Sequence, residues 1–234
     1  MKKAIIFYSG GKDSHYVLYK LIKSGYNIPF LLNLEPIPHS DALLYFTSLY
    51  NKKIIREHSK LMNIEIFYFR QDRKMGSIFN ENQGLFFENL ITVLKTKIDD
   101  FTLFWANDRS NMYEDRKKII AIKNVLIKRK IKIVFPLEKK DLRDIILEST
   151  NCGIKSICVG MEVPRFFNLV GKVIDRNFLN SIDNNIKGEH IQSFVIESPL
   201  FGGKKIEPLV FKKEVNNKGF FLRILKYKVS SEFI

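Results

Sequence analysis

One short segment near the start of the chain combines small, cationic, acidic and hydroxyl residues: Ser9, Gly10, Gly11, Lys12, Asp13 and Ser14. Two adjacent glycines let a backbone approach a phosphate closely and turn its N–H groups toward it. Lys12 supplies a mobile cation, and the hydroxyls of Ser9 and Ser14 can donate to phosphate oxygens. Asp13 carries a carboxylate of the kind that holds the Mg²⁺ accompanying a nucleotide. The segment therefore predicts a site for the phosphates of a nucleotide.

The spacing of this segment excludes two common nucleotide motifs. A Walker-type loop needs four residues between its first glycine and its Gly-Lys pair, and a dinucleotide fingerprint needs G-x-G-x-x-G. Neither pattern occurs at residues 9–14. The structural alternative is a tight strand-to-helix turn without a ligand. The combination of hydroxyls, glycines, lysine and aspartate behind an apolar strand favours the phosphate site.

The elements around the segment predict a β-α-β opening. Residues 4–8 form a continuous apolar run, as expected for a parallel strand buried on both faces. Apolar residues then recur at helical spacing at positions 17, 18, 21 and 22. Gly25 stands where a helix C′ residue adopts a left-handed conformation, and residues 28–34 predict the next strand. A helix that begins directly behind the glycines adds its positive amino-terminal end to the phosphate site.

The alternation of strands and helices continues to Pro136. The pattern predicts helices over 48–62, 86–98 and 115–129, and strands over 64–69, 102–105 and 131–135. Such alternation is typical of a parallel sheet with right-handed crossovers, so we expect a Rossmann-like α/β fold.

After Pro136 the pattern changes. A helix with Leu142, Ile145, Ile146 and Ser149 on its inner face leads through Gly153 into a strand over 154–159. A longer helical stretch is expected next, then a strand over 193–196. The last thirty residues predict a hairpin with its turn at 216–219. We therefore expect two domains, 1–136 for nucleotide binding and a smaller α+β domain over 137–234 for the substrate.

The segment at residues 9–14 resembles the pyrophosphate loop of the ATP pyrophosphatase superfamily. Along residues 1–201 the chain is most similar to the diphthine–ammonia ligase family. The positions that carry this resemblance are Tyr8 through Ser14, Tyr19, Ser110, Asn111, Arg116, Pro136, Leu137, Asp141, Gly171, Asp175 and the run from Phe194 to Phe201. The family has glutamate, two glycines, glutamate, an aromatic residue, an acidic residue and threonine where this chain has residues 187–193. His190 and Gln192 stand at two of the acidic positions.

The resemblance implies a sheet of the adenine nucleotide alpha hydrolase type, with ATP and Mg²⁺ as cofactors. It also implies amide formation. The carboxylate of diphthine on translation elongation factor 2 would be adenylated with release of pyrophosphate, and ammonia would then displace AMP.

Further site residues follow from the same resemblance. On the nucleotide side they are Asn107, Ser110 and Arg116, which follow a predicted strand; the structural alternative for Asn107 is a helix cap. Lys172 stands at the family's arginine position and could neutralise phosphate charge, or it is an ordinary exposed helix lysine. Glu189 and His190 could bind or deprotonate ammonia, and otherwise they are loop residues at a helix end.

Composition limits the remaining classes of function. The formal charge of +14, from 39 Lys and Arg against 25 Asp and Glu, suits acidic partners such as RNA, or reflects solvated lysines. Two cysteines, Cys152 and Cys158, do not have the spacing of a zinc or iron–sulfur site. The apolar run at the amino terminus is too short for a signal peptide or membrane span, so we expect a cytoplasmic protein. A tRNA-modifying enzyme of the superfamily and a non-catalytic ATP-binding module remain as alternatives to the ligase.

Overall fold

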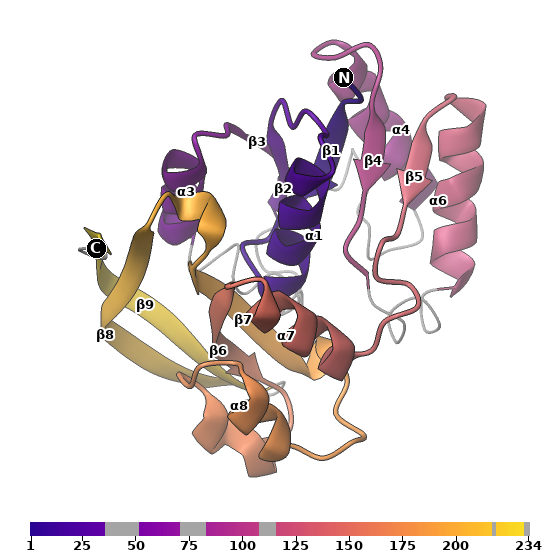
Figure 1. Ribbon diagram of the computed structural model, residues 1–234. Coiled ribbons are helices and arrows are strands. Elements are labelled where there is room, and N and C mark those ends of the chain that lie inside the picture. The colour runs from indigo at the N-terminus through magenta and orange to yellow at the C-terminus, as the bar shows by residue number, and fades with distance from the viewer. Residues whose placement is uncertain (36–51, 71–82, 108–115, 217–218, 232–234) are drawn as a thin grey trace.

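A five-stranded parallel sheet forms the centre of the first part of the chain. The computed structural model describes residues 1–35, 52–70, 83–107, 116–216 and 219–231 (Figure 1). The strands are β1 (Ala4–Phe7), β2 (Leu31–Glu35), β3 (Ile66–Arg70), β4 (Thr102–Phe104) and β5 (Lys132–Val134). They lie in the order β3-β2-β1-β4-β5, and every pair is parallel. This topology is the predicted Rossmann-like arrangement, with β1 at the centre and the order reversing between β1 and β4.

Helices cover both faces of this sheet. They are α1 (Lys12–Lys23), α3 (Lys52–Met62), α4 (Gln83–Lys95) and α6 (Arg116–Lys128). Successive side chains of β1 point to opposite faces, so Ile5 packs with α4 and α6 whereas Ile6 packs with α1 and α3. All four residues of β1 are buried, which explains its uninterrupted apolar sequence.

The second part of the chain is built on four antiparallel strands. They are β6 (Lys155–Met161), β7 (Ile191–Glu197), β8 (Lys204–Asn216) and β9 (Gly219–Ser231), and they close in the order β6-β7-β8-β9. Helix α7 (Leu142–Asn151) precedes them and buries the four residues predicted for its inner face. The predicted hairpin is confirmed by the pairing of β8 with β9 up to Asn216 and Gly219.

The prediction of a longer helix between β6 and β7 is wrong. Three short pieces stand there instead: η2 (Pro164–Leu169), α8 (Arg176–Asn180) and η3 (Gly188–His190). Residues 172–174 form an extended segment because they pair with β6: the N–H of Cys158 donates to the Lys172 carbonyl at 2.9 Å, and the N–H of Ile174 donates to the Ser156 carbonyl at 2.8 Å. Gly171, at φ +93°, ends η2, and the Asp175 side chain caps α8.

Strand and helix ends differ from the sequence expectation by a few residues. The second strand begins at Leu31 rather than at residue 28, because its pairing with β3 begins at Leu31, opposite Ile66. Of the predicted helix over 48–62, residues 52–62 form α3, and the earlier positions lie outside the described residues. Gly25 has φ +77° after the end of α1, as predicted.

The two parts of the chain share one hydrophobic core. Ile6, Val17 and Leu18 of the first part belong to the same buried cluster as Ile146, Val159 and Phe194 of the second part. In the described part of the chain, no helix is both long enough and apolar enough to span a membrane.

Candidate active site

The loop between β1 and α1 lies at the carboxyl edge of the parallel sheet. Gly10 adopts φ +80°, a left-handed conformation that glycine enters without strain. Gly11 is the N-cap of α1 and is extended. Ligands of open α/β sheets bind at this edge, beside the strands where the order reverses. The loop follows β1, and Asn107 follows the neighbouring β4, so the two flank that position.

Both glycines are also required by packing inside the protein. A Cβ atom on Gly10 would lie 3.2 Å from Ile55 Cγ1 and 3.2 Å from Phe194 Cε2. A Cβ atom on Gly11 would lie 3.2 Å from the Ser193 carbonyl oxygen. The glycines therefore allow α3 and β7 to approach the loop closely.

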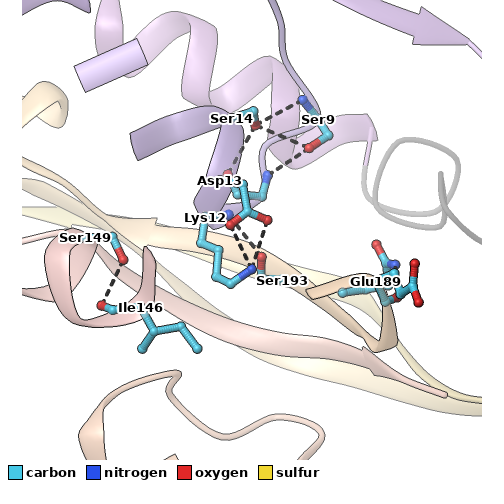
Figure 2. Close-up of polar contacts among 10 residues, drawn as sticks. Ser9, Lys12, Asp13, Ser14, Ile146, Ser149, Glu189 and Ser193 are labelled. Atoms are coloured by element: carbon cyan, nitrogen blue, oxygen red, sulfur yellow. Dashed lines mark hydrogen bonds and ion pairs between the residues drawn. The ribbon is translucent and has the colours of Figure 1, made fainter. Parts of the chain in front are cut away.

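The hydroxyls of the loop make long contacts with one another. Gly11 N–H donates to Ser9 Oγ at 3.3 Å, and Ser9 N–H donates to Ser14 Oγ at 3.3 Å (Figure 2). The two hydroxyl oxygens are themselves 3.3 Å apart, where a good hydroxyl bond measures about 2.8 Å. Ser14 Oγ donates to the Gly11 carbonyl at 3.2 Å. These weak bonds leave the loop's polar groups able to exchange partners.

Lys12 and Asp13 form a close ion pair at the first turn of α1. Lys12 Nζ lies 2.9 Å from both carboxylate oxygens of Asp13. The Lys12 side chain is 1% exposed and that of Asp13 is 31% exposed. A buried ammonium is stabilised by an anion, so the pair places a cation and a carboxylate side by side at the helix amino terminus. Figure 2 shows both side chains beside Ser193 of β7.

Strand β7 of the second part of the chain completes the loop. Lys12 N–H donates to Ser193 Oγ at 3.0 Å, and Val195 N–H donates to the Gly10 carbonyl at 3.0 Å. Helix α1 has no capping side chain at Gly11, so Ser193 satisfies one of its first N–H groups from 181 residues away. Sequence reasoning missed Ser193 as a site residue. No local signal marks it, because β7 also carries the polar residues Gln192 and Glu197.

A chain of buried hydrogen bonds lies beneath the loop. Tyr8 Oη is 2.9 Å from His15 Nδ1 and 2.7 Å from His58 Nδ1. His15 Nε2 is 2.7 Å from Ser198 Oγ, and His58 Nε2 is 2.7 Å from the Val195 carbonyl oxygen. The His58 ring also stacks on Phe194 with 4.6 Å between ring centroids.

The direction of each bond in this chain follows from the fixed groups at its ends. The Val195 carbonyl can only accept, so His58 donates from Nε2 and accepts from the Tyr8 hydroxyl at Nδ1. Tyr8 Oη then accepts from His15 Nδ1, and His15 Nε2 accepts from the Ser198 hydroxyl. Leu200 N–H donates to Ser198 Oγ at 3.1 Å. Every polar side-chain atom of this hydrogen-bonded network therefore has a partner when both imidazoles are neutral.

Burial keeps both histidines uncharged. Desolvation first, and the neighbouring His58 second, lower the pKa of His15 well below its ordinary value. Desolvation lowers the pKa of His58 to about 3, against the opposing effect of its bond to Val195. Burial also raises the pKa of the Tyr8 phenol. None of these groups is poised to exchange protons near neutral pH, so the network supports the loop structurally.

The remaining predicted site residues lie in several places. Glu189 and His190 lie in η3, directly before β7, with Glu189 Oε1 3.8 Å from His190 Nε2. Figure 2 shows Glu189 to one side of the group formed by Lys12, Asp13 and Ser193. Lys172 is exposed and stands in the extended segment beside β6, so its interpretation as a helix lysine is wrong.

The nucleotide-side candidates after β4 are described in part. Asn107 is half-buried at the carboxyl edge of the sheet. Arg116 is the first residue of α6, but its side chain lies outside the described residues, as does the whole of Ser110. Among the residues that the structure describes, no group of three or more His, Cys, Asp and Glu side chains could hold a metal.

Two solved structures are similar to this chain in part. One is a predicted subunit of tRNA methyltransferase from Methanocaldococcus jannaschii, with a TM-score of 0.41 and 19% identity over 70% of this chain and 79% of that one. The other is the U34-tRNA thiolase NcsA from Methanococcus maripaludis with its [4Fe-4S] cluster, with a TM-score of 0.43 and 17% identity. That match covers 64% of this chain and 57% of the thiolase. No protein-family model and no curated protein matches the chain.

Proposed function

We propose that this protein is an ATP-dependent ligase that adenylates a carboxylate, releases pyrophosphate and lets ammonia displace AMP. The observation that carries the proposal is the buried Lys12 ammonium, 2.9 Å from Asp13, at the amino terminus of α1 behind the two glycines. The site lies at the carboxyl edge of a parallel sheet, beside the point where the strand order reverses. By the resemblance of the sequence, the acceptor is the diphthine carboxylate of translation elongation factor 2.

The residues present fit ATP and Mg²⁺. The amino terminus of α1 offers backbone N–H groups and a positive dipole end to a phosphate. Lys12 would turn from Asp13 to the pyrophosphate, and Asp13 would then hold Mg²⁺ together with phosphate oxygens and water, as is usual for this ion. Ser9 and Ser14 would exchange their long mutual contacts for phosphate oxygens. Bound Mg²⁺ supplies charge neutralisation of the phosphates.

The protein's part in the reaction is positioning and charge stabilisation. A carboxylate oxygen of the acceptor attacks the α-phosphorus, and the bond to the β-phosphate oxygen breaks. Lys12 and the first N–H groups of α1 would stabilise the charge that accumulates on the departing pyrophosphate. Ammonia then attacks the acyl carbon, AMP leaves, and the nitrogen loses a proton. Glu189 and His190 are the groups we propose for binding ammonia and accepting that proton, because they precede the strand that carries Ser193.

The nucleotide product tests the proposal directly. The protein is incubated with Mg-ATP and ammonium, with and without diphthine-bearing elongation factor 2, and AMP is separated from ADP. We expect AMP that depends on both the factor and ammonium. ATP binding without any AMP would instead support a non-catalytic ATP-binding module.

Two variants assign the chemistry to the loop. Lys12→Met should reduce AMP formation by about a hundredfold or more, because a charge that stabilises the departing group is lost. Lys23→Ala, at the other end of the same helix, is the matched control and should retain full activity. Equal activity in both variants would remove Lys12 from the site.

A second candidate is a tRNA-modifying enzyme of the same superfamily. The observation that favours it is a cavity of about 620 Å³ lined by Lys2, Lys3, Lys130 and Lys132, with Asp100 among its lining residues. Cationic cavities suit phosphate groups, and the chain has a charge of +14. Sulfur transfer through Cys158 is disfavoured, since burial raises the pKa of this thiol to about 12. AMP formation that requires tRNA rather than the elongation factor would establish this candidate.

A further inference from the structure

The two longest strands of the molecule form a ribbon with an unusual surface. Strands β8 and β9 pair along their whole length, from Lys204 opposite Ser231 to Asn216 opposite Gly219. Figure 1 shows this ribbon on the opposite side of the molecule from β5 and α6. Six of the eleven exposed large hydrophobic residues in the described part of the chain lie on it: Leu209, Val210, Phe211, Val215, Leu225 and Val229.

The apolar side chains gather at the centre of the ribbon. Val210 pairs with Lys226, and Phe211 pairs with Ile224, so the pairing is irregular here. Leu209 and Leu225 lie between the paired positions of their strands. Leu209, Val210 and Phe211 are consecutive and are 46–49% exposed, and Leu225 is 53% exposed. Ile224, which pairs with Phe211, is 7% exposed, so the exposed apolar surface at this point comes from the irregular stretch of β8 and from Leu225.

Basic residues surround this apolar centre. The two strands carry seven cationic residues: Lys204, Lys205, Lys212, Lys213, Arg223, Lys226 and Lys228. They carry two acidic residues, and both are already paired within the ribbon. Glu207 lies 2.8 Å from Lys228 and 3.5 Å from Lys205, and Glu214 lies 3.5 Å from Lys212. An apolar centre with a polar rim is the anatomy of a protein interface, and the rim here is mostly basic.

The ends of the ribbon are fixed to the body of the protein. Phe220 and Phe221 pair with Met161 and Gly160 of β6, and Phe220 stacks on Phe167. Near the other end, the Tyr227 hydroxyl donates to Glu57 of α3 at 3.1 Å. The ribbon thus has a defined position relative to the loop. The residue of β7 that faces Gly160 is Gln192, next to Ser193 of the candidate active site.

We propose that the centre of the β8–β9 ribbon docks an acidic, apolar surface of the protein that carries the acceptor carboxylate. This inference rests on the proposed function. The basic rim selects a partner with carboxylates, and it opposes pairing between two copies of this chain because like charges would meet. Single-stranded RNA is disfavoured as the occupant. Nucleic acids are bound through phosphates and stacked aromatic rings, whereas five of the six exposed residues are aliphatic.

The test uses peptide probes that do not depend on the ATP chemistry. One peptide alternates glutamate with leucine, a control peptide replaces each glutamate with lysine, and the third probe is an oligouridine of the same charge as the acidic peptide. We expect the acidic peptide to bind at least about tenfold more tightly than the other two, with binding that weakens as salt increases.

Variants locate the binding on the ribbon. The triple substitution Val210→Ser, Phe211→Ser and Leu225→Ser should weaken the acidic peptide about tenfold or more. Ile120→Ser with Ile127→Ser removes two exposed apolar residues from α6 and should leave binding unchanged. Lys213→Glu with Lys226→Glu should weaken binding and flatten its salt dependence. Circular dichroism and the midpoint of urea denaturation confirm that each variant is folded.

Three outcomes would overturn the proposal. In the first, the acidic peptide binds the triple variant as tightly as it binds the wild-type protein. In the second, oligouridine binds the wild-type protein more tightly than the acidic peptide does. In the third, sedimentation shows a concentration-dependent dimer that the triple substitution abolishes. Failure of the ligase proposal is separate, because it is measured by AMP formation. A ribbon that binds the acidic peptide in a protein without AMP formation would still be a docking surface.

Discussion

At the scale of single residues, the buried chain from Ser198 through His15, Tyr8 and His58 to Val195 is the most constrained part of the site. Each of the four side chains donates one hydrogen bond and accepts one, and the donations run in one direction toward the Val195 carbonyl, which only accepts. A fully satisfied buried network specifies a unique arrangement, whereas a partly satisfied one is costly. The network joins β1, α1 and α3 to β7, and so holds the loop between β1 and α1 against the second part of the chain.

Replacing Tyr8 with phenylalanine should destabilise the protein markedly. The change leaves one imidazole donor and one imidazole acceptor buried without a partner, at about 1–3 kcal/mol each. We therefore expect a loss of about 2–4 kcal/mol in the free energy of unfolding, measured by urea denaturation. Tyr19→Phe, on the partly buried face of α1, is the control and should cost less than about 1 kcal/mol. Equal losses of unfolding free energy in the two variants would show that the Tyr8 hydroxyl does not stabilise the protein more than an ordinary tyrosine hydroxyl does.

The same network predicts acid sensitivity. The pKa of His58 is about 3 in the folded protein and near 6.5 when unfolded, so below pH 6.5 the unfolded chain binds a proton that the folded chain does not. Stability is therefore fully present above pH 6.5 and falls as the pH decreases toward 3. The loss is about 1.4 kcal/mol per pH unit for His58, and His15 acts in the same direction. Urea denaturation at pH 7.5, 6.5 and 5.5 measures it.

A variant shows whether the histidines cause the acid sensitivity. His58→Gln should lower stability at neutral pH and reduce the slope of stability against pH between 6.5 and 5. An unchanged slope in this variant would assign the acid sensitivity to other groups.

At the level of helices and strands, the turn between β1 and α1 requires glycine at position 10 for its backbone conformation and for its close packing. Gly25, which follows α1, shares the backbone conformation and serves as a comparison. Gly10 and Gly25 both have left-handed φ angles, +80° and +77°. A Cβ atom on Gly10 would meet Ile55 and Phe194 at 3.2 Å, whereas nothing lies within 4 Å of one on Gly25. The two positions therefore differ in packing but share the same backbone conformation.

Alanine substitutions separate these two contributions. Gly25→Ala should cost about 1–2 kcal/mol, the backbone contribution alone. Gly10→Ala should cost about 1–3 kcal/mol more, because the new methyl group must displace α3 or β7. It should also weaken ATP binding measured by calorimetry, whereas Gly25→Ala should not. Equal destabilisation by both changes would mean that the packing around Gly10 yields without cost.

At the scale of the whole molecule, the two predicted domains are joined by more than a linker. Buried residues of β1 and α1 share one core with those of α7, β6 and β7. The hydrogen bonds from Lys12 and Val195 connect the loop to β7. A boundary near Pro136 remains our proposal for where the topology changes, but it is not expected to separate two independently stable units.

A fragment of residues 1–136 should therefore fail to fold alone. Removing the second part would expose one face of β1 and α1, including Tyr8, Val17 and Leu18, to water. We expect the full chain to unfold in a single calorimetric transition and the fragment to lack one. Two resolved transitions in the full chain, or a cooperative transition in the fragment, would contradict the shared core.

Local patterns along the chain predict the parallel sheet, the turn after β1 and the hairpin. Buried strands are continuously apolar, helices repeat every three or four residues, and turns need particular residues. The element boundaries differ from the predicted ones by a few residues. The helix predicted after β6 does not form, because residues 172–174 pair with β6 instead.

Tertiary structure alone decided which distant residues complete the site. Ser193 and His58 have no local signal that relates them to residues 9–14, since a serine in a strand and a histidine in a helix are ordinary. Both reach the loop because β7 and α3 pack against Gly10 and Gly11. Burial then removes the charge from His58 and leaves the Lys12 ammonium beside Asp13, and burial is a property of the whole fold rather than of any segment.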